Sequence, residues 1–154
     1  MEIFLLVANK SEGVSGEPVE AYQVAMRRLK SKTWGMYANT PHRKVVSVND
    51  KVVIYVAGSG YLGKHFIASA DIVKVVEGKN VKNDLWLETP QVATLELGCI
   101  KYFDVPVSIK EVKDCLDFIP KNTSKWGCVL QRGLKRIKQS DFNTIIRFSN
   151  KACR

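Results

Sequence analysis

Two neighbouring stretches decide how this sequence folds: Thr33-Trp34-Gly35-Met36-Tyr37 and, after a basic segment, Val48-Asn49-Asp50-Lys51-Val52-Val53-Ile54-Tyr55-Val56. The second stretch predicts a buried strand because it is rich in β-branched residues. In the first, an aromatic plane stands beside a glycine, with basic clusters on both sides. Aromatic faces stack on nucleobases, and lysine and arginine neutralise phosphates. The two stretches together predict a site for a flat anionic ligand, and a nucleobase on its phosphate backbone fits this description best.

The charge is unevenly distributed along the chain. The net charge is +9, from 24 Lys and Arg against 15 Asp and Glu, and the pI is about 9.5. One basic cluster contains Arg27, Arg28, Lys30, Lys32, Arg43 and Lys44. The second contains Lys121, Lys125, Arg132, Lys135, Arg136, Lys138, Arg147, Lys151 and Arg154, against the single acidic residue Asp141. Clustered positive charge is typical of a nucleic-acid binder, whereas a solvated basic face is the common alternative. We favour binding because both clusters flank a tryptophan.

Length and composition predict one domain spanning residues 1–154. The chain is 45% apolar, enough for a substantial core, and contains no linker, internal repeat or low-complexity tract. No apolar run approaches the roughly 20 residues that span a bilayer, so no membrane partner is expected. The four cysteines form no Cys-x-x-Cys pair and complete no zinc spacing with the two histidines. We therefore expect no metal and no cofactor, and reduced thiols in a cytoplasmic protein.

The remaining pattern predicts mixed α and β structure. Glu2-Ala8 is an apolar run typical of a strand buried on both faces, and Pro18 can open a helix that continues to Lys30. Lys51-Ala57 and His65-Val76 are expected to form a hairpin joined by the loop Gly58-Lys64.

That loop spells Gly-x-Gly-x-x-Gly and also Gly-x-x-x-x-Gly-Lys. Both motifs require a helix after the last glycine, but strand-forming residues follow here, so we interpret the loop as a turn. A phosphate contact by Lys64 is the alternative.

No catalytic constellation is recognisable. The two histidines have no candidate nucleophile beside them, and the carboxylates scatter over different predicted elements. The sequence therefore predicts a protein that is not an enzyme.

Taken in order, the blocks Ile3-Asn9, Thr33-Tyr37, Val48-Val56, Phe118-Gly127 and Ile137-Phe142 resemble the EVE domain family. This family belongs to the PUA-like superfamily and is similar to YTH domains, and the ordered match covers essentially the whole chain. The resemblance implies an α+β fold, a PUA-like small curved β-barrel of mixed strands with helices packed around it. It also implies a non-catalytic activity, namely holding a modified or flipped-out base in an aromatic pocket.

The resemblance assigns five residues to this pocket. Trp34 would be the stacking floor, and Gly35 would let the backbone approach the exocyclic group of the base. Asn9 would present its amide to the base edge, Tyr55 would lie near the pocket wall, and Phe4 lies where relatives carry tryptophan. Each residue has a structural alternative: Trp34 a core lid, Asn9 a turn residue, and Tyr55 a core residue with its hydroxyl bonded.

The phosphate-contacting residues are expected from the basic clusters and the glycine loop: Arg27, Arg28, Lys32, Arg43, Lys64, Lys125, Lys135 and Arg136. The sequence thus predicts a reader of DNA or RNA containing a modified base, whose functional partner could be a nuclease or a modification enzyme. One alternative is an enzyme similar to the ASCH group, which hydrolyses nucleosides. Its Gly-x-Lys-x-x-Glu-x-Arg pattern is matched by Gly133-Ser140 only without the glutamate and the arginine. A third hypothesis is a general PUA-type RNA-binding adaptor without a base pocket, which gains if Trp34 is buried.

Overall fold

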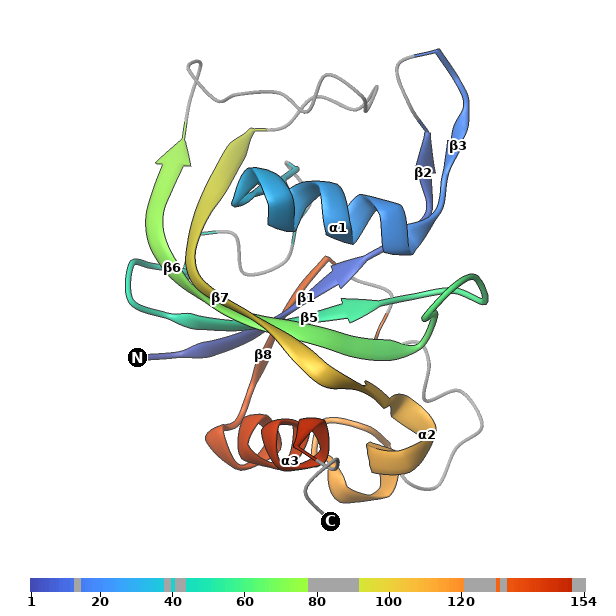
Figure 1. Cartoon of the computed structure of the whole chain (residues 1–154). Helices are drawn as coiled ribbons and strands as arrows, with labels where there is room; N and C mark the ends of the chain where they lie inside the picture. Colours follow the sequence, from blue (N-terminus) through green and yellow to red (C-terminus); the bar gives the residue numbers. More distant parts are fainter. Residues whose placement is uncertain are drawn as a thin grey trace.

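The fold is built on one curved mixed sheet of six strands, seen in a computed structural model that describes residues 1–12, 15–37, 40, 44–77, 92–120, 130 and 133–150. The strands lie in the order β4-β7-β6-β5-β1-β8. Their bounds are β1 Ile3–Ala8, β4 Thr33–Met36, β5 Lys51–Val56, β6 His65–Glu77, β7 Ala93–Ser108 and β8 Leu134–Ile137. Figure 1 shows the long β6 and β7 bending together across the molecule. The predicted α+β class and the curved sheet are confirmed.

Helices cover both faces of this sheet. The helix α1 (Ala21–Ser31) packs on one face, while α2 (Ile109–Val112) and α3 (Gln139–Ser149) pack on the other (Figure 1). A turn of 3-10 helix, Lys113–Cys115, follows α2. Helix α1 begins later than predicted: residues Pro18–Val19 form β3, which pairs with β2 (Ser11–Glu12) as a short hairpin.

The sheet separates two apolar clusters because successive side chains of a strand point to opposite faces. Every residue of β1 is buried. Phe4, Leu6 and Ala8 enter the cluster under α1, which we call the α1-side cluster, whereas the alternate residues of β1 enter the cluster under α2 and α3, the α3-side cluster. Burial on both faces explains the continuous apolar run of β1 in the sequence.

The hairpin prediction is also confirmed. Strand β5 pairs in parallel with β1 and antiparallel with β6, and the glycine loop joins β5 to β6. The loop leads into strand β6 and not into a helix. The two phosphate-binding motifs need a helix at this point, so the loop is a turn, as the sequence predicted.

Candidate nucleic-acid interface

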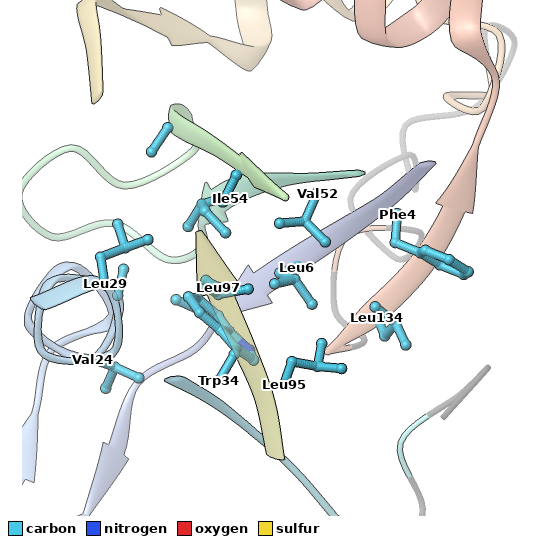
Figure 2. Packing of buried hydrophobic residues seen from close by; sticks show 14 of the residues in the cluster. Phe4, Leu6, Val24, Leu29, Trp34, Val52, Ile54, Leu95, Leu97 and Leu134 are labelled. Atoms are coloured by element: carbon cyan, nitrogen blue, oxygen red, sulfur yellow. The ribbon is translucent and has the colours of Figure 1, made fainter. Parts of the chain in front are cut away.

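Trp34 lies in the α1-side cluster. It stands on the edge strand β4 opposite Leu95 of β7, and its residue surface is only 3% exposed. Figure 2 shows the indole among Leu95 and Leu97, with Val24 and Leu29 of α1 on one side of the view. This arrangement corrects the expectation that the ring is partly exposed in an open pocket. Apolar residues of β7 and α1 pack around it.

Arg28 is buried beside Trp34. It is 4% exposed, and its guanidinium carbon lies 5.2 Å from the centroid of the Trp34 ring. Nη1 donates a hydrogen bond of 3.0 Å to the carbonyl of Gly35, and Nη2 donates one of 3.0 Å to the hydroxyl of Tyr37. The guanidinium thus holds β4 against α1, and this arrangement does not expose it for the phosphate contact expected from the sequence. The Gly35 carbonyl, where a base was expected to approach, already accepts a hydrogen bond.

Phe4 and Tyr55 lie on opposite faces of the sheet. The parallel register aligns Phe4 with Val52 and Val7 with Tyr55, so Phe4 points into the α1-side cluster and Tyr55 into the α3-side cluster. Both are at most 2% exposed, and burial raises the pKa of the Tyr55 hydroxyl. A single pocket cannot contain both side chains. The two-residue period of β5 therefore removes Tyr55 from the site expected around Trp34.

Asn9 and Lys64 lie at the other end of the parallel pair. Asn9 follows the last residue of β1 and is exposed. Strand β5 ends beside it, since the Ala57 amide donates a 2.9 Å hydrogen bond to the Ala8 carbonyl. Lys64 ends the glycine loop with a φ of 62° and is also exposed. The carboxyl ends of neighbouring parallel strands are a common location for ligand binding in α/β sheets.

The edge strand β8 forms a basic surface next to a pocket of about 520 Å³. Lys135 and Arg136 line this pocket together with Lys138, which follows the strand. Arg136 lies 3.5 Å from the Glu2 carboxylate, and Lys138 lies 3.6 Å from the Asp117 carboxylate. These pairs involve well-exposed side chains and are worth little stability, so the cations can be redirected to a ligand at small cost.

The other predicted phosphate contacts are less informative. Arg27 and Lys32 are exposed, on α1 and at its end respectively. Arg43 and Lys125 lie outside the described residues. The interface therefore has exposed cations on β8, on the glycine loop and on α1, but the structure does not gather them around Trp34.

Two residues near these surfaces were missed from the sequence. Tyr61, in the glycine loop, is 70% exposed, and Asp141, in the first turn of α3, is 1% exposed and lines the β8 pocket. Oδ1 of Asp141 accepts a 2.8 Å hydrogen bond from the Asp117 amide, while burial raises the pKa of its carboxyl group. An aromatic residue between loop glycines was the available signal for Tyr61, whereas no local pattern marked Asp141 as buried.

The described residues hold no cluster of three or more histidine, cysteine, aspartate or glutamate side chains placed to bind a metal ion. None of the helices among these residues is long and apolar enough to cross a membrane.

Neither a protein-family profile nor a curated protein matches the chain. Solved structures do match it over nearly its whole length. Human THYN1 in complex with 5-methylcytosine-containing DNA superposes with a TM-score of 0.65 at 12% identity, covering 97% of this chain and 98% of that one. The DUF55 domain of human thymocyte nuclear protein 1 superposes with a TM-score of 0.59 at 11% identity, covering 96% of this chain and 98% of that one. The MmI1 YTH domain superposes with a TM-score of 0.55 at 9% identity, covering 99% of this chain and 98% of that one. These structures share the overall fold of this chain, including the YTH domain whose fold the sequence resemblance led us to expect.

Proposed function

We propose that this protein is a non-catalytic module that binds DNA or RNA and holds a modified base turned out of its stack. The observation that carries the proposal is the fold shared over 97% of the chain with human THYN1, whose structure contains 5-methylcytosine DNA. The exposed cations of β8 and the glycine loop support it independently.

The basic surface of β8 supplies the affinity in this proposal. Lys135 and Arg136 lie on the edge strand β8, Lys138 follows it, and all three line the same pocket. Lysine and arginine release condensed counterions when they neutralise phosphates, and this term is independent of sequence. Such contacts position the nucleic acid without identifying its bases.

Base reading is assigned to Trp34, Gly35 and Asn9. Because the Trp34 ring is covered, a base can stack on it only after a neighbouring side chain moves. Turning a base out costs a few kcal/mol, and an aromatic stack returns about 1–3 kcal/mol. An added methyl group contributes only about 1–3 kcal/mol of discrimination in an apolar pocket, so the expected preference for a modified base is modest.

The burial of Trp34 favours a second candidate function, a nucleic-acid-binding adaptor of the PUA type without a base pocket. This adaptor would use the same basic surface. It differs in having no preference among bases.

A panel of labelled oligonucleotides tests both candidates. Fluorescence anisotropy would measure the dissociation constants of single-stranded DNA, duplex DNA and RNA, each with cytosine or 5-methylcytosine at one position, at two salt concentrations. Binding that weakens with salt, together with about a fivefold or larger preference for one modification, supports base reading. Equal affinities support the adaptor, and no binding to any oligonucleotide refutes both. Release of free base from nucleosides would contradict the non-catalytic assignment.

A further inference from the structure

Tyr61 is held outward by a tightly folded loop. The Gly63 amide donates a 2.8 Å hydrogen bond to the Gly60 carbonyl, and the Lys64 amide donates one of 2.6 Å to the Val56 carbonyl. A Cβ atom at Gly63 would lie 2.4 Å from the Gly58 carbonyl oxygen, so only glycine fits there. Leu62 packs against the α1-side cluster and anchors the loop. The loop thus has a defined shape with Tyr61 near its tip.

A second tyrosine supports this ring. Tyr22, in the first turn of α1, contacts Tyr61 with the ring centroids 4.8 Å apart and the planes at 80°. Aromatic rings favour such edge-to-face contacts, so the pair favours this orientation of the Tyr61 ring. Tyr61 nevertheless remains 70% exposed, so most of the ring surface is open to solvent. An oriented, exposed aromatic surface contributes little to the core but is well suited to stacking.

The position of the pair matches a ligand site. The loop follows β5, next to the end of β1, where Asn9 and Lys64 are exposed (Figure 1). Glu20 is the nearby carboxylate, and it lies 3.8 Å from the ammonium group of Lys10, which reduces its repulsion of an anion. Tyr61 and Lys64 are exposed on the same loop. Aromatic rings that stack on bases and cations that contact phosphates are the groups with which proteins hold unpaired bases.

We propose that Tyr61, braced by Tyr22, is a stacking platform for an unpaired base, and that Lys64 contacts the adjoining phosphate. The inference rests on the proposed nucleic-acid binding and adds that the protein takes a single-stranded or locally unpaired segment at the carboxyl ends of β1 and β5. Duplex bases are already stacked on both faces, so a continuous duplex gains nothing from this ring.

The test compares single-strand and duplex binding of variants by fluorescence anisotropy. Tyr61→Ala should weaken binding of a labelled single-stranded oligonucleotide by about 5- to 150-fold, and Tyr61→Phe should retain most of the affinity because it keeps the ring. Duplex affinity should change less than twofold. Tyr102→Ala, at a tyrosine of β7 that is 49% exposed, is the matched control and should bind like the wild type.

Lys64→Gln should lower the salt dependence of single-strand binding, whereas Lys110→Gln, at an exposed lysine of α2, should leave it unchanged. If Tyr61→Ala binds the single strand as tightly as the wild type, or if Tyr102→Ala loses as much affinity as Tyr61→Ala, the stacking platform is overturned and the proposed function still stands. Wild-type protein that binds no oligonucleotide overturns the proposed function itself. Denaturation midpoints of all variants separate loss of binding from loss of folding.

Discussion

Trp34 and Tyr61 have similar surroundings in the sequence and opposite surroundings in the structure. Each lies beside a glycine and close to basic residues, yet Trp34 is 3% exposed and Tyr61 is 70% exposed. Trp34 lies on strand β4, and its side chain points into the cluster under α1. Tyr61 lies on a loop that is anchored through the neighbouring residue Leu62. The element that presents an aromatic side chain, and not its sequence neighbours, decides whether a ligand can reach it.

Neighbouring arginines of α1 repeat this contrast. Arg27 is exposed, and Arg28 is buried against Trp34 with hydrogen bonds to β4. Residues on the buried side should therefore control stability, and residues on the exposed side should control binding. The following substitutions test this separation, from the largest expected effect to the smallest.

Removal of the Trp34 side chain should have the largest effect. Trp34→Ala empties a core aromatic site and should lower the free energy of unfolding by about 3–5 kcal/mol, measured by urea denaturation. Tyr102→Ala, at an exposed tyrosine, should change it by less than about 0.5 kcal/mol. A Trp34→Ala protein that stays stable and loses base discrimination would support the base reading proposed for Trp34, and it would break the comparison by showing that a ligand reaches this ring. A Trp34→Ala protein that is destabilised while the wild type shows no preference among bases would favour the adaptor.

Arg28 and its neighbour provide a matched pair. Arg28→Ala leaves the Gly35 carbonyl and the Tyr37 hydroxyl without this donor, and hydrogen bonds to charged groups are worth about 1.5–3 kcal/mol. We expect a loss of about 2–3 kcal/mol in the free energy of unfolding. Arg27→Ala should cost less than about 0.5 kcal/mol, since exposed charges contribute little. Equal losses in urea denaturation would contradict the division between these two residues.

How far the sequence could predict the fold depends on the element. The run Ile3–Ala8 and the hairpin of β5 and β6 were predictable, because burial on both faces and strand-forming residues around a glycine loop leave strong local signals. The buried face of helix α1 left a weaker signal in the sequence. Its buried positions are Ala21, Val24, Ala25, Arg28 and Leu29.

The spacing of these buried positions is that of one helical face, and small residues on it let the helix approach the sheet closely. The resulting stripe contains Arg28, which the sequence alone placed with the solvent-exposed cations. The sequence also placed Phe4 and Tyr55 in one pocket, although they lie on opposite faces of the sheet. Which face of the sheet a residue occupies depends on the register between β1 and β5, and this register is a long-range property.

On the exposed side, charge removal at β8 should alter binding without altering folding. Lys135→Gln combined with Arg136→Gln should weaken all oligonucleotides alike and reduce the slope of log affinity against log salt by about 0.7–0.9 per lost phosphate contact. The free energy of unfolding should change by less than about 0.5 kcal/mol. Salt titrations followed by anisotropy measure the slope, and Lys110→Gln is the control. An unchanged slope would exclude β8 from the backbone interface.

Asp141 lies at the boundary between the two sides, because it is a buried carboxyl group that lines the basic β8 pocket. Burial raises its pKa in the folded protein, although the Asp117 amide, which donates to its Oδ1, acts in the opposite direction. The unfolded chain has a carboxyl pKa near 3.9, so the folded protein keeps the proton to a higher pH than the unfolded chain does. The unfolded state then binds fewer protons than the folded state over this interval, and stability falls as pH rises through the folded pKa.

Asp141→Asn retains a side-chain carbonyl that can accept the Asp117 amide and has no charge to desolvate. The stability of the variant relative to the wild type should therefore increase as pH rises from about 3.5 and level off once Asp141 is ionised in the folded wild type. Urea denaturation across pH 3–7 measures the difference, with Asp104→Asn, at an exposed carboxylate of β7, as the control for losing one negative charge. If the difference in the free energy of unfolding between Asp141→Asn and the wild type does not vary with pH, the Asp141 carboxyl group is ionised at no cost. Asp141 would then behave like the exposed residues and not like the buried ones.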